Sequence, residues 1–478
     1  MKKLRLAALL FAVVLCLQSC GVIVINDLNG GGTSSPSDTD TDRSSDTHEV
    51  KEIIIDKKTS DDMKKKADET LSALSLQKYS GLRVFIASTD TLFFEGDGSP
   101  TPLTNDRVIR VEKISSKLDA DVKINKYTED ELYEKLRSAV NKKEYFADVI
   151  AVPTRLVGKL AADGLIKSLR TVPDFDLGAE YFDAGSIQAF SGGHMTYALS
   201  GDGCFEPEKL YCVYFNKDMA KQLGFDMYSL LSNGQWTLEK YAECVSAAQA
   251  AGKETASVKS LDPYKRMLLC GSGFRFADSG TDKIPSANTF TEEYKNKVRL
   301  LSSLPEASKA SSPDSFLAGG SLFYIDTVYA AETMADSSLV WGMLPFPKYG
   351  EAYENGAYVS DGATVLCIPE YVPDERLSGD LIEAFCAASS GYIKYDYLYH
   401  NMLDVLRDNG SVNSLNTIMN NPNYDFVRTM KTGYPTLYAN TAGAFDELVS
   451  GELSFSDYAS REAEVKEYME KWFPVKYR

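Results

Sequence analysis

The 478-residue sequence contains only three histidines and three tryptophans, and it lacks the common nucleophile and nucleotide-binding motifs. His48 lies in a polar segment, and no G-x-S-x-G motif accompanies His194 or His400. H-E-x-x-H, P-loop and dinucleotide fingerprints are also missing. These absences argue against serine hydrolases, zinc proteases and nucleotide-dependent enzymes. The 68 acidic residues leave a two-carboxylate glycosidase open, but we predict that the chain is not an enzyme.

The cysteines also lack a metal-binding pattern. None of the eight forms a C-x-x-C pair, and none has a histidine nearby. We therefore expect no structural zinc and no other metal or cofactor. Cys204 and Cys212 flank one loop, and their spacing leaves open whether they form a disulfide.

Basic residues are fewer than acidic ones, 51 against 68. The net charge is −17, and the longest basic run, at residues 64–66, follows two aspartates on a predicted helix. Such a chain repels nucleic acid, so no nucleic-acid partner is expected. The 44% hydrophobic and 25% charged residues are typical of globular proteins, and the length indicates about two domains.

The first 20 residues have the pattern of a secretory signal. A basic start precedes an apolar run at 6–17, which is too short to span a membrane. The ending Leu17-Gln18-Ser19-Cys20 resembles a bacterial lipobox, which implies a diacylglyceryl lipid on Cys20; the alternative is an ordinary cleaved signal with a free Cys20. Residues 21–58, rich in Gly, Ser, Thr and Asp, are predicted to be an acidic linker that holds a folded domain near a membrane.

From residue 59 onward, helical and strand patterns alternate. The predicted elements are a helix at 59–80, a strand at 82–87, a helix from 105, a strand at 121–125, a helix at 129–141, a strand at 147–152 and a helix at 154–162. This alternation predicts an α/β fold with a mostly parallel sheet flanked by helices. Ligands on such sheets bind beyond the carboxyl ends of the strands, which here present Thr89, Asp90 and Thr154.

The second half contains a distinctive series of segments. Residues 210–252 predict a strand, a short helix ending at Gly224, and a long helix that Thr237 caps after Trp236, a residue expected in the core. Further on come an F-L-A-G-G block at 316–320, a strand at 321–325, a helix at 326–335 and the run VWGMLPFP at 340–347. A returning strand at 358–369, a helix at 377–389 and a closing helix at 450–468 complete the series.

The order and spacing of these segments resemble the extracellular solute-binding proteins of ABC importers, family 1, the group that includes maltose-binding proteins. The resemblance covers roughly residues 82–473. It implies a two-lobed periplasmic-binding-protein-like (type II) fold, each lobe a mostly parallel sheet flanked by helices. The expected bounds are 59–205 and 356–405 for the first lobe, and 206–355 and 406–478 for the second, with a hinge at 200–209.

The resemblance also implies a function and a site. The expected function is a lipid-anchored, extracytoplasmic receptor, monomeric, that captures a small ligand, most simply a sugar, and delivers it to an ABC permease in the membrane. In the resemblance, Tyr329 and Tyr438 match ligand-stacking aromatic residues, and Asp326 and Asp361 stand in loops expected to face the cleft with Thr89 and Asp90. A peptide or other solute receptor on this fold, or a surface lipoprotein that docks glycans without transport, remains an alternative.

Overall fold

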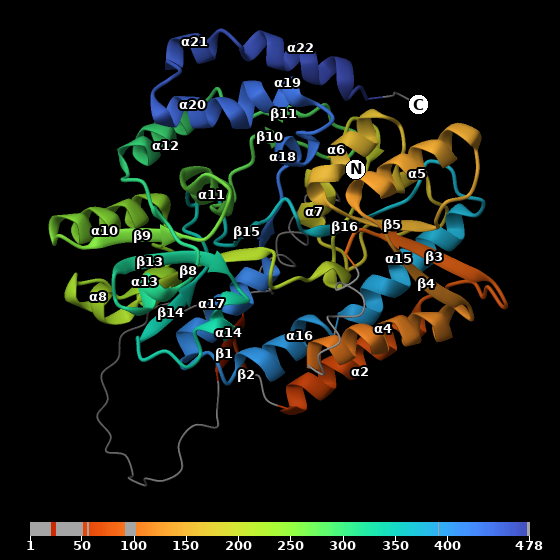
Figure 1. Cartoon of the computed structure of the whole chain (residues 1–478), viewed down its shortest axis with the longest axis horizontal. Helices are drawn as coiled ribbons and strands as arrows, with labels where there is room; N and C mark the ends of the chain where they lie inside the picture. The colour runs from red at the N-terminus through yellow and green to blue at the C-terminus, as the bar shows by residue number, and fades with distance from the viewer. Residues whose placement is uncertain (1–20, 25–50, 55–56, 91–101, 391, 476–478) are drawn as a thin grey trace, which may run out of the picture.

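The computed structural model describes residues 21–24, 51–54, 57–90, 102–390 and 392–475. Cys20 and the signal segment lie outside these residues, and so does the linker, apart from the paired strands β1 (Gly21–Val24) and β2 (Lys51–Ile54) and the start of helix α2 (Lys57–Ala73). The rest forms two α/β lobes, with the first sheet on the right of Figure 1 and the second on the left. No helix in the described part of the chain combines the length and the apolar character that a membrane span requires.

The first lobe contains a four-stranded sheet in the order β16-β5-β3-β4. Its strands are β3 (Arg83–Ser88), β4 (Asp121–Lys126), β5 (Val149–Pro153) and β16 (Thr364–Cys367). β3 pairs in parallel with β4 and β5, and β16 pairs antiparallel with β5. The carboxyl ends of β3 and β5 therefore lie at the same edge as the amino end of β16.

Helices cover both faces of the first sheet. Besides α2 they are α4 (Pro102–Leu118), α5 (Glu129–Lys142), α6 (Thr154–Ala162), α7 (Ala184–Ala189), α15 (Glu375–Ser389) and α16 (Lys394–Tyr397), with short turns η1 (Leu169–Thr171), η2 (Asp202–Cys204) and η3 (Leu398–Met402) and the hairpin β6 (Ser191–Gly192) to β7 (Met195–Thr196). α4 and α15 share one core with the sheet. α5 begins with a capping box between Thr128 and Glu131, which satisfies two N–H groups at its start.

The second sheet has the order β12-β9-β13-β8-β15-β17, with β14 also paired to β8. Its strands are β8 (Leu210–Asn216), β9 (Glu254–Val258), β12 (Ser308–Lys309), β13 (Ser321–Thr327), β14 (Trp341–Leu344), β15 (Ala357–Val359) and β17 (Pro422–Asn423). β8 runs antiparallel to β13, β14 and β15, whereas the other pairs are parallel. This sheet is thus mixed rather than mostly parallel, because β8 enters it from the edge where β13 and β15 end.

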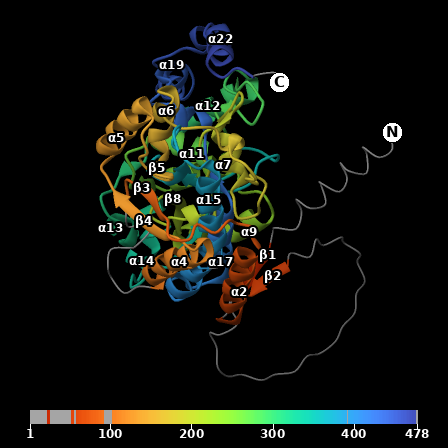
Figure 2. The same ribbon diagram turned by 90° about the vertical axis from the view of Figure 1, so that its right-hand side faces the viewer.

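The helices of the second lobe occur between these strands and in the C-terminal region. They are α8 (Lys217–Gln222), α9 (Met227–Ser232), α10 (Leu238–Ala250), α11 (Tyr264–Gly271), α12 (Glu292–Ser303), α13 (Asp314–Leu317), α14 (Ala330–Thr333), α17 (Asn409–Asn420), α18 (Phe426–Met430), α19 (Pro435–Tyr438), α20 (Ala444–Ser450), α21 (Phe455–Ala459) and α22 (Glu462–Trp472), with the turn η4 (Ala439–Gly443) and the pair β10 (Ala277–Asp278) and β11 (Ser286–Ala287). α19 and α22 lie at one end of the molecule and α2 at the other (Figure 2).

The stretch from β8 to α10 supplies much of the second core. Trp236 is fully buried, and its indole N–H donates to Pro345 O at 2.9 Å. The rings of Tyr241 and Phe323 stack with centroids 4.8 Å apart. Thr237 caps α10 through the N–H of Lys240, as the sequence predicts. The prediction that Trp236 is a packing residue is confirmed.

The chain passes between the lobes three times, and the first two crossovers, before β8 and between β15 and β16, are hydrogen-bonded to each other. Ser360 N donates to Lys209 O at 2.9 Å, and Thr364 N donates to a carboxylate oxygen of Glu206 at 2.7 Å. Glu206 is 5% exposed, and burial raises its pKa from an ordinary value of 4.5 to about 7. A buried carboxylate thus connects the first crossover to the second.

The lobes also meet where α6 packs on α18 and the segment after it. A Cβ on Gly158 would lie 2.8 Å from the backbone of Met430, and a Cβ on Gly433 would overlap Gly158 O. Thr432 Oγ1 donates to Arg155 O at 2.7 Å and accepts from Lys159 N at 3.1 Å. The approach is therefore backbone against backbone and requires glycine on both sides.

The structure corrects several predicted elements. Residues 358–369 do not form one strand: Tyr358 lies in β15 of the second sheet, and residues 364–367 form β16 of the first. The chain therefore returns to the first lobe after Val359, not at residue 356. The helix predicted at 326–335 is shortened to α14, because β13 continues to Thr327. Cys204 and Cys212 are both free thiols.

The raised pKa of Glu206 predicts a pH-dependent stability. The folded state holds the proton more tightly than the unfolded state, so this residue disfavours folding increasingly as pH rises from about 4.5 to about 7. Glu206→Gln should therefore increase the free energy of unfolding at pH 8 by up to about 3 kcal/mol, which raises the melting temperature, and should change both little at pH 5. Glu208→Gln, an exposed neighbour, is the control. Equal effects of Glu206→Gln at both pH values would contradict the assignment.

The glycine contact predicts a specific effect on lobe separation. Gly158→Ala forces α6 away from Met430, an overpacking cost of about 1–3 kcal/mol that falls on the contact between lobes. The radius of gyration from X-ray scattering should increase while each lobe stays folded by circular dichroism. Gly350→Ala is the matched control, because its nearest neighbour atom would be 3.7 Å away. An unchanged radius in Gly158→Ala would rule out this contact in solution.

Candidate functional site

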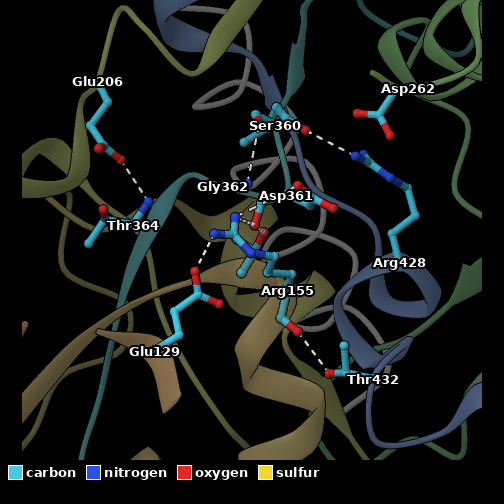
Figure 3. Close-up of polar contacts among 12 residues, drawn as sticks. Glu129, Arg155, Glu206, Asp262, Ser360, Asp361, Gly362, Thr364, Arg428 and Thr432 are labelled. Carbon is cyan, nitrogen blue, oxygen red and sulfur yellow. Dashed lines mark hydrogen bonds and ion pairs between the residues drawn. The ribbon is translucent and has the colours of Figure 1, made fainter. Parts of the chain in front are cut away.

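At the edge of the first lobe, polar groups follow the ends of β3 and β5. Thr89 N donates to Ala151 O at 3.2 Å, and Asp90 N donates to Ser88 Oγ at 3.1 Å. Both residues are half-buried, so the predicted residues Thr89 and Asp90 are fixed on the carboxyl edge of the sheet. Arg155, two residues after β5, forms an ion pair with Glu129 at the start of α5 (Figure 3).

The second crossover brings Asp361 to Arg155. The backbone N–H of Arg155 donates to Asp361 O at 3.0 Å, and the two charged groups are 3.9 Å apart. A Cβ on the neighbouring Gly362 would lie 3.1 Å from Arg155 Nη1 and 3.8 Å from Lys209 Nζ. The half-buried Asp361 is therefore close to Arg155, as Figure 3 shows, and the residue after it lies near Lys209.

Opposite this edge, the second lobe carries the half-buried Tyr211 and Asp262, with the fully buried Tyr358 behind them. The rings of Tyr211 and Tyr358 meet edge to face with centroids 5.9 Å apart. Tyr358 donates its hydroxyl to Asp262 at 2.7 Å. Burial raises the pKa of Tyr211, and the charges of Asp326, Asp262 and Asp361 raise it further. The charges of the predicted residues Asp326 and Asp361, which come from different segments, thus act on the same tyrosine.

Two arginines extend this arrangement. Arg266 Nη1 donates to Tyr438 at 2.6 Å and to Asp446 at 2.6 Å, and its Nη2 lies 3.6 Å from Asp262. The guanidinium of Arg428 lies over the Tyr358 ring at 4.3 Å from the centroid. Arg428 also donates to the Tyr358 hydroxyl and, at 3.2 Å, to Val359 O.

We refer to these residues of the second lobe as the tyrosine–arginine cluster: Tyr211, Asp262, Arg266, Tyr358, Arg428 and Tyr438. The cluster contains the predicted residue Tyr438. Its members are linked in series by hydrogen bonds and ring contacts. In Figure 3, Asp262 and Arg428 lie to the right of Asp361 and Arg155, which are at the centre of the view. Acceptors, donors and aromatic faces therefore converge between the lobes.

Of the two other predicted residues of the second lobe, Asp326 is buried and Tyr329 is exposed. Asp326 is 3% exposed and accepts hydrogen bonds from Tyr324 Oη at 2.6 Å and Thr327 N at 2.7 Å. Both of its oxygens are thus engaged, which makes it a support for β13 rather than an open acceptor. Tyr329 is 43% exposed, and its N–H donates to Pro207 O at 3.2 Å beside the first crossover.

Six residues of this arrangement are absent from the predicted site: Arg155, Tyr211, Asp262, Arg266, Tyr358 and Arg428. Arg155 and Tyr211 have a readable signal, since one follows the end of a predicted strand and the other begins one. Asp262 follows β9, a short strand of small residues that hydrophobic patterning does not reveal. Arg428 reaches the cluster through packing of distant segments, for which the local sequence has no signal.

Comparison with solved structures confirms the fold. A cyclic α-maltosyl-1,6-maltose binding protein from Arthrobacter globiformis is 13% identical with a TM-score of 0.55, covering 82% of this chain and 99% of its own. The sugar-binding protein MalE from Xanthomonas citri is 13% identical with a TM-score of 0.53, covering 81% and 98%. The galacto-N-biose/lacto-N-biose I-binding protein of an ABC transporter from Bifidobacterium longum is 15% identical with a TM-score of 0.50, covering 84% and 100%.

These likenesses establish a two-lobed periplasmic-binding-protein-like architecture, as the sequence predicts. No curated protein matches the sequence. A family model does: residues 110–397, more than half of the chain, match the model described as bacterial extracellular solute-binding protein. The chain therefore belongs to the family of bacterial extracellular solute-binding proteins.

Proposed function

We propose that this receptor captures a carbohydrate between its lobes and delivers it to an ABC-type permease. The observation that carries the proposal is that two half-buried rings, Tyr211 and Tyr438, lie in one cluster with the half-buried carboxylate of Asp262, while the second crossover carries the half-buried Asp361. A sugar needs flat apolar faces for its C–H groups and acceptors for its hydroxyls. The similar solved structures include receptors for maltose-type and lacto-N-biose ligands, which supports this ligand class.

The charge pairing also favours an uncharged ligand over a peptide. Arg155 is paired with Glu129, and Arg266 is paired with Asp446. A peptide with charged termini would have to disrupt these pairs, whereas hydroxyl groups can add hydrogen bonds without breaking them. Thermal-shift and calorimetric screening of the purified receptor against neutral oligosaccharides and short peptides tests this preference. Tight binding of peptides with no response to any sugar would contradict it.

A lipid on Cys20 completes the proposal. The secretory pattern and the family membership support a receptor outside the cytoplasm. Lipid on the first mature residue, followed by a polar linker, would keep the lobes beside the permease in the same membrane. The receptor can act as a monomer, since the two lobes of one chain form a complete cleft.

The exposed ring of Tyr329 predicts a selective effect on affinity. If the ring stacks on the bound sugar, Tyr329→Ala weakens binding by about 1–3 kcal/mol, roughly ten- to a hundredfold. The unliganded melting temperature should change little, because the ring is 43% exposed. Tyr371→Ala is the matched control: its ring is 37% exposed and follows β16 at the opposite edge of the first sheet. Calorimetric affinity unchanged in Tyr329→Ala would remove this residue from the site.

The lipid anchor predicts a change in membrane association. Cys20→Ser should release most of the protein into the detergent-free soluble fraction, without altering its melting temperature. Cys16→Ser, within the signal, should leave the protein in the membrane fraction. Equal membrane association of Cys20→Ser and wild type would show that lipid on Cys20 does not hold the receptor.

A further inference from the structure

A cavity of about 920 Å³ lies between the lobes; no residue of the tyrosine–arginine cluster lines it, and Lys209, Leu210 and Val359 of the crossovers separate the two spaces. In the second lobe its wall includes Tyr353 and Asn421, which precede β15 and β17. These parallel strands run in the same direction as β13, so the two residues lie at the amino ends of the strands, opposite the edge that carries the cluster. We call this space the rear cavity. Its volume is in the range of small-molecule sites.

The lining of the rear cavity combines buried carboxylates with basic groups. Asp183 caps α7, and Asp202 lies 3.8 Å from Lys394. Burial raises the pKa of both carboxyl groups, although Lys394 opposes the shift. Arg275, on the opposite wall, donates to Gln188 at 2.7 Å. Groups of both signs face the space, because the wall includes six acidic residues (Glu180, Asp183, Asp202, Glu206, Asp278 and Glu354) and four basic ones (Lys66, Lys209, Arg275 and Lys394).

Glu206 adds a second, independent indication of a ligand. It lines the rear cavity and is 5% exposed. Within the described part of the chain it accepts one hydrogen bond, from Thr364 N, and no basic side chain lies within 4.0 Å of it. A buried carboxylate with unused acceptor capacity costs free energy unless something donates to it.

Aromatic faces complete the chemistry. Tyr353 and Tyr395 line the cavity from opposite lobes and are half-buried. Among the described residues, neither hydroxyl takes part in a hydrogen bond. Flat rings beside carboxylates and amines match a ligand that has C–H faces and both donates and accepts hydrogen bonds. A charged ligand would leave either the acidic or the basic groups without compensation.

We propose that the rear cavity is a second binding site, for a neutral polyhydroxylated molecule of oligosaccharide type. The proposal extends the proposed function, since it assigns the receptor a sugar site separate from the cleft. The walls come from both lobes and from the first crossover, so the shape of the site depends on the angle between the lobes. Occupancy of the rear cavity is therefore coupled to closure of the cleft, and the coupling is reciprocal.

The test compares two variants of the full chain in isothermal titration with maltotriose, cellotriose and xylotriose, and with spermidine as a charged probe. The double variant Asp262→Ala/Tyr329→Ala weakens sugar binding in the cleft. Ala184→Trp fills the rear cavity: Ala184 is exposed, lines the cavity and begins α7, so the substitution removes no hydrogen bond. Ala459→Trp is the matched control, because Ala459 is an exposed alanine of α21 that lines neither site, and melting temperatures check that each variant folds.

We expect at least one trisaccharide to bind the double variant at a single site, and Ala184→Trp added to that variant to weaken this binding tenfold or more. Residual binding that Ala184→Trp leaves unchanged, a double variant that binds none of the sugars, or binding of spermidine alone would each overturn the proposal. The two sites are separable by outcome. If the double variant loses all sugar binding, the proposed cleft site stands and the rear cavity is ruled out. If the double variant binds as tightly as wild type and Ala184→Trp abolishes that binding, the rear cavity is supported and the proposed cleft site is contradicted.

Discussion

The hydrogen bond from Thr364 N to the buried carboxylate of Glu206 is the interaction on which the relation between the lobes depends. Each lobe has a sheet that its own residues bury, so each can keep its core whatever the angle between them. The angle is set where the chain passes from one sheet to the other. There the N–H groups of the second crossover need acceptors in a space that excludes water, and the first crossover provides them through Glu206 and Lys209 O.

The two faces of this junction have different chemistry for a topological reason. Strand ends of both sheets converge on the side that carries Asp361, Tyr211 and Tyr358, and loops at strand ends present side chains freely. On the other side, the amino ends of β15 and β17 and the start of α7 surround a cavity. A hinge of this kind changes both spaces together, since a rotation that narrows one widens the other. Binding at either face therefore acts on a single rotation.

Much of the first lobe is predictable because its signals are local. β3, α5 and β5 follow from strand runs, a capping box and helical spacing within short windows. Thr89 and Asp90 follow from the rule that loops after parallel strands face a ligand. The mixed second sheet is less predictable, because β9 is short and rich in small residues and β17 spans two residues. Asp262 depends on recognising β9, and Arg428 depends on a contact with Tyr358 that is 70 residues away in the chain. The burial of Asp326 depends on Tyr324, which bonds to it from the same strand.

The contact between Gly158 and Gly433 has a kinetic consequence. Where two backbones touch without intervening side chains, no rotamer has to change and no interlocked side chain has to separate when the surfaces part. The polar contacts at this point are the two hydrogen bonds of Thr432, and water can replace them one at a time. A smooth joint of this kind separates with a low barrier. The residence time of a captured molecule would then be set by its own contacts rather than by the joint that encloses it.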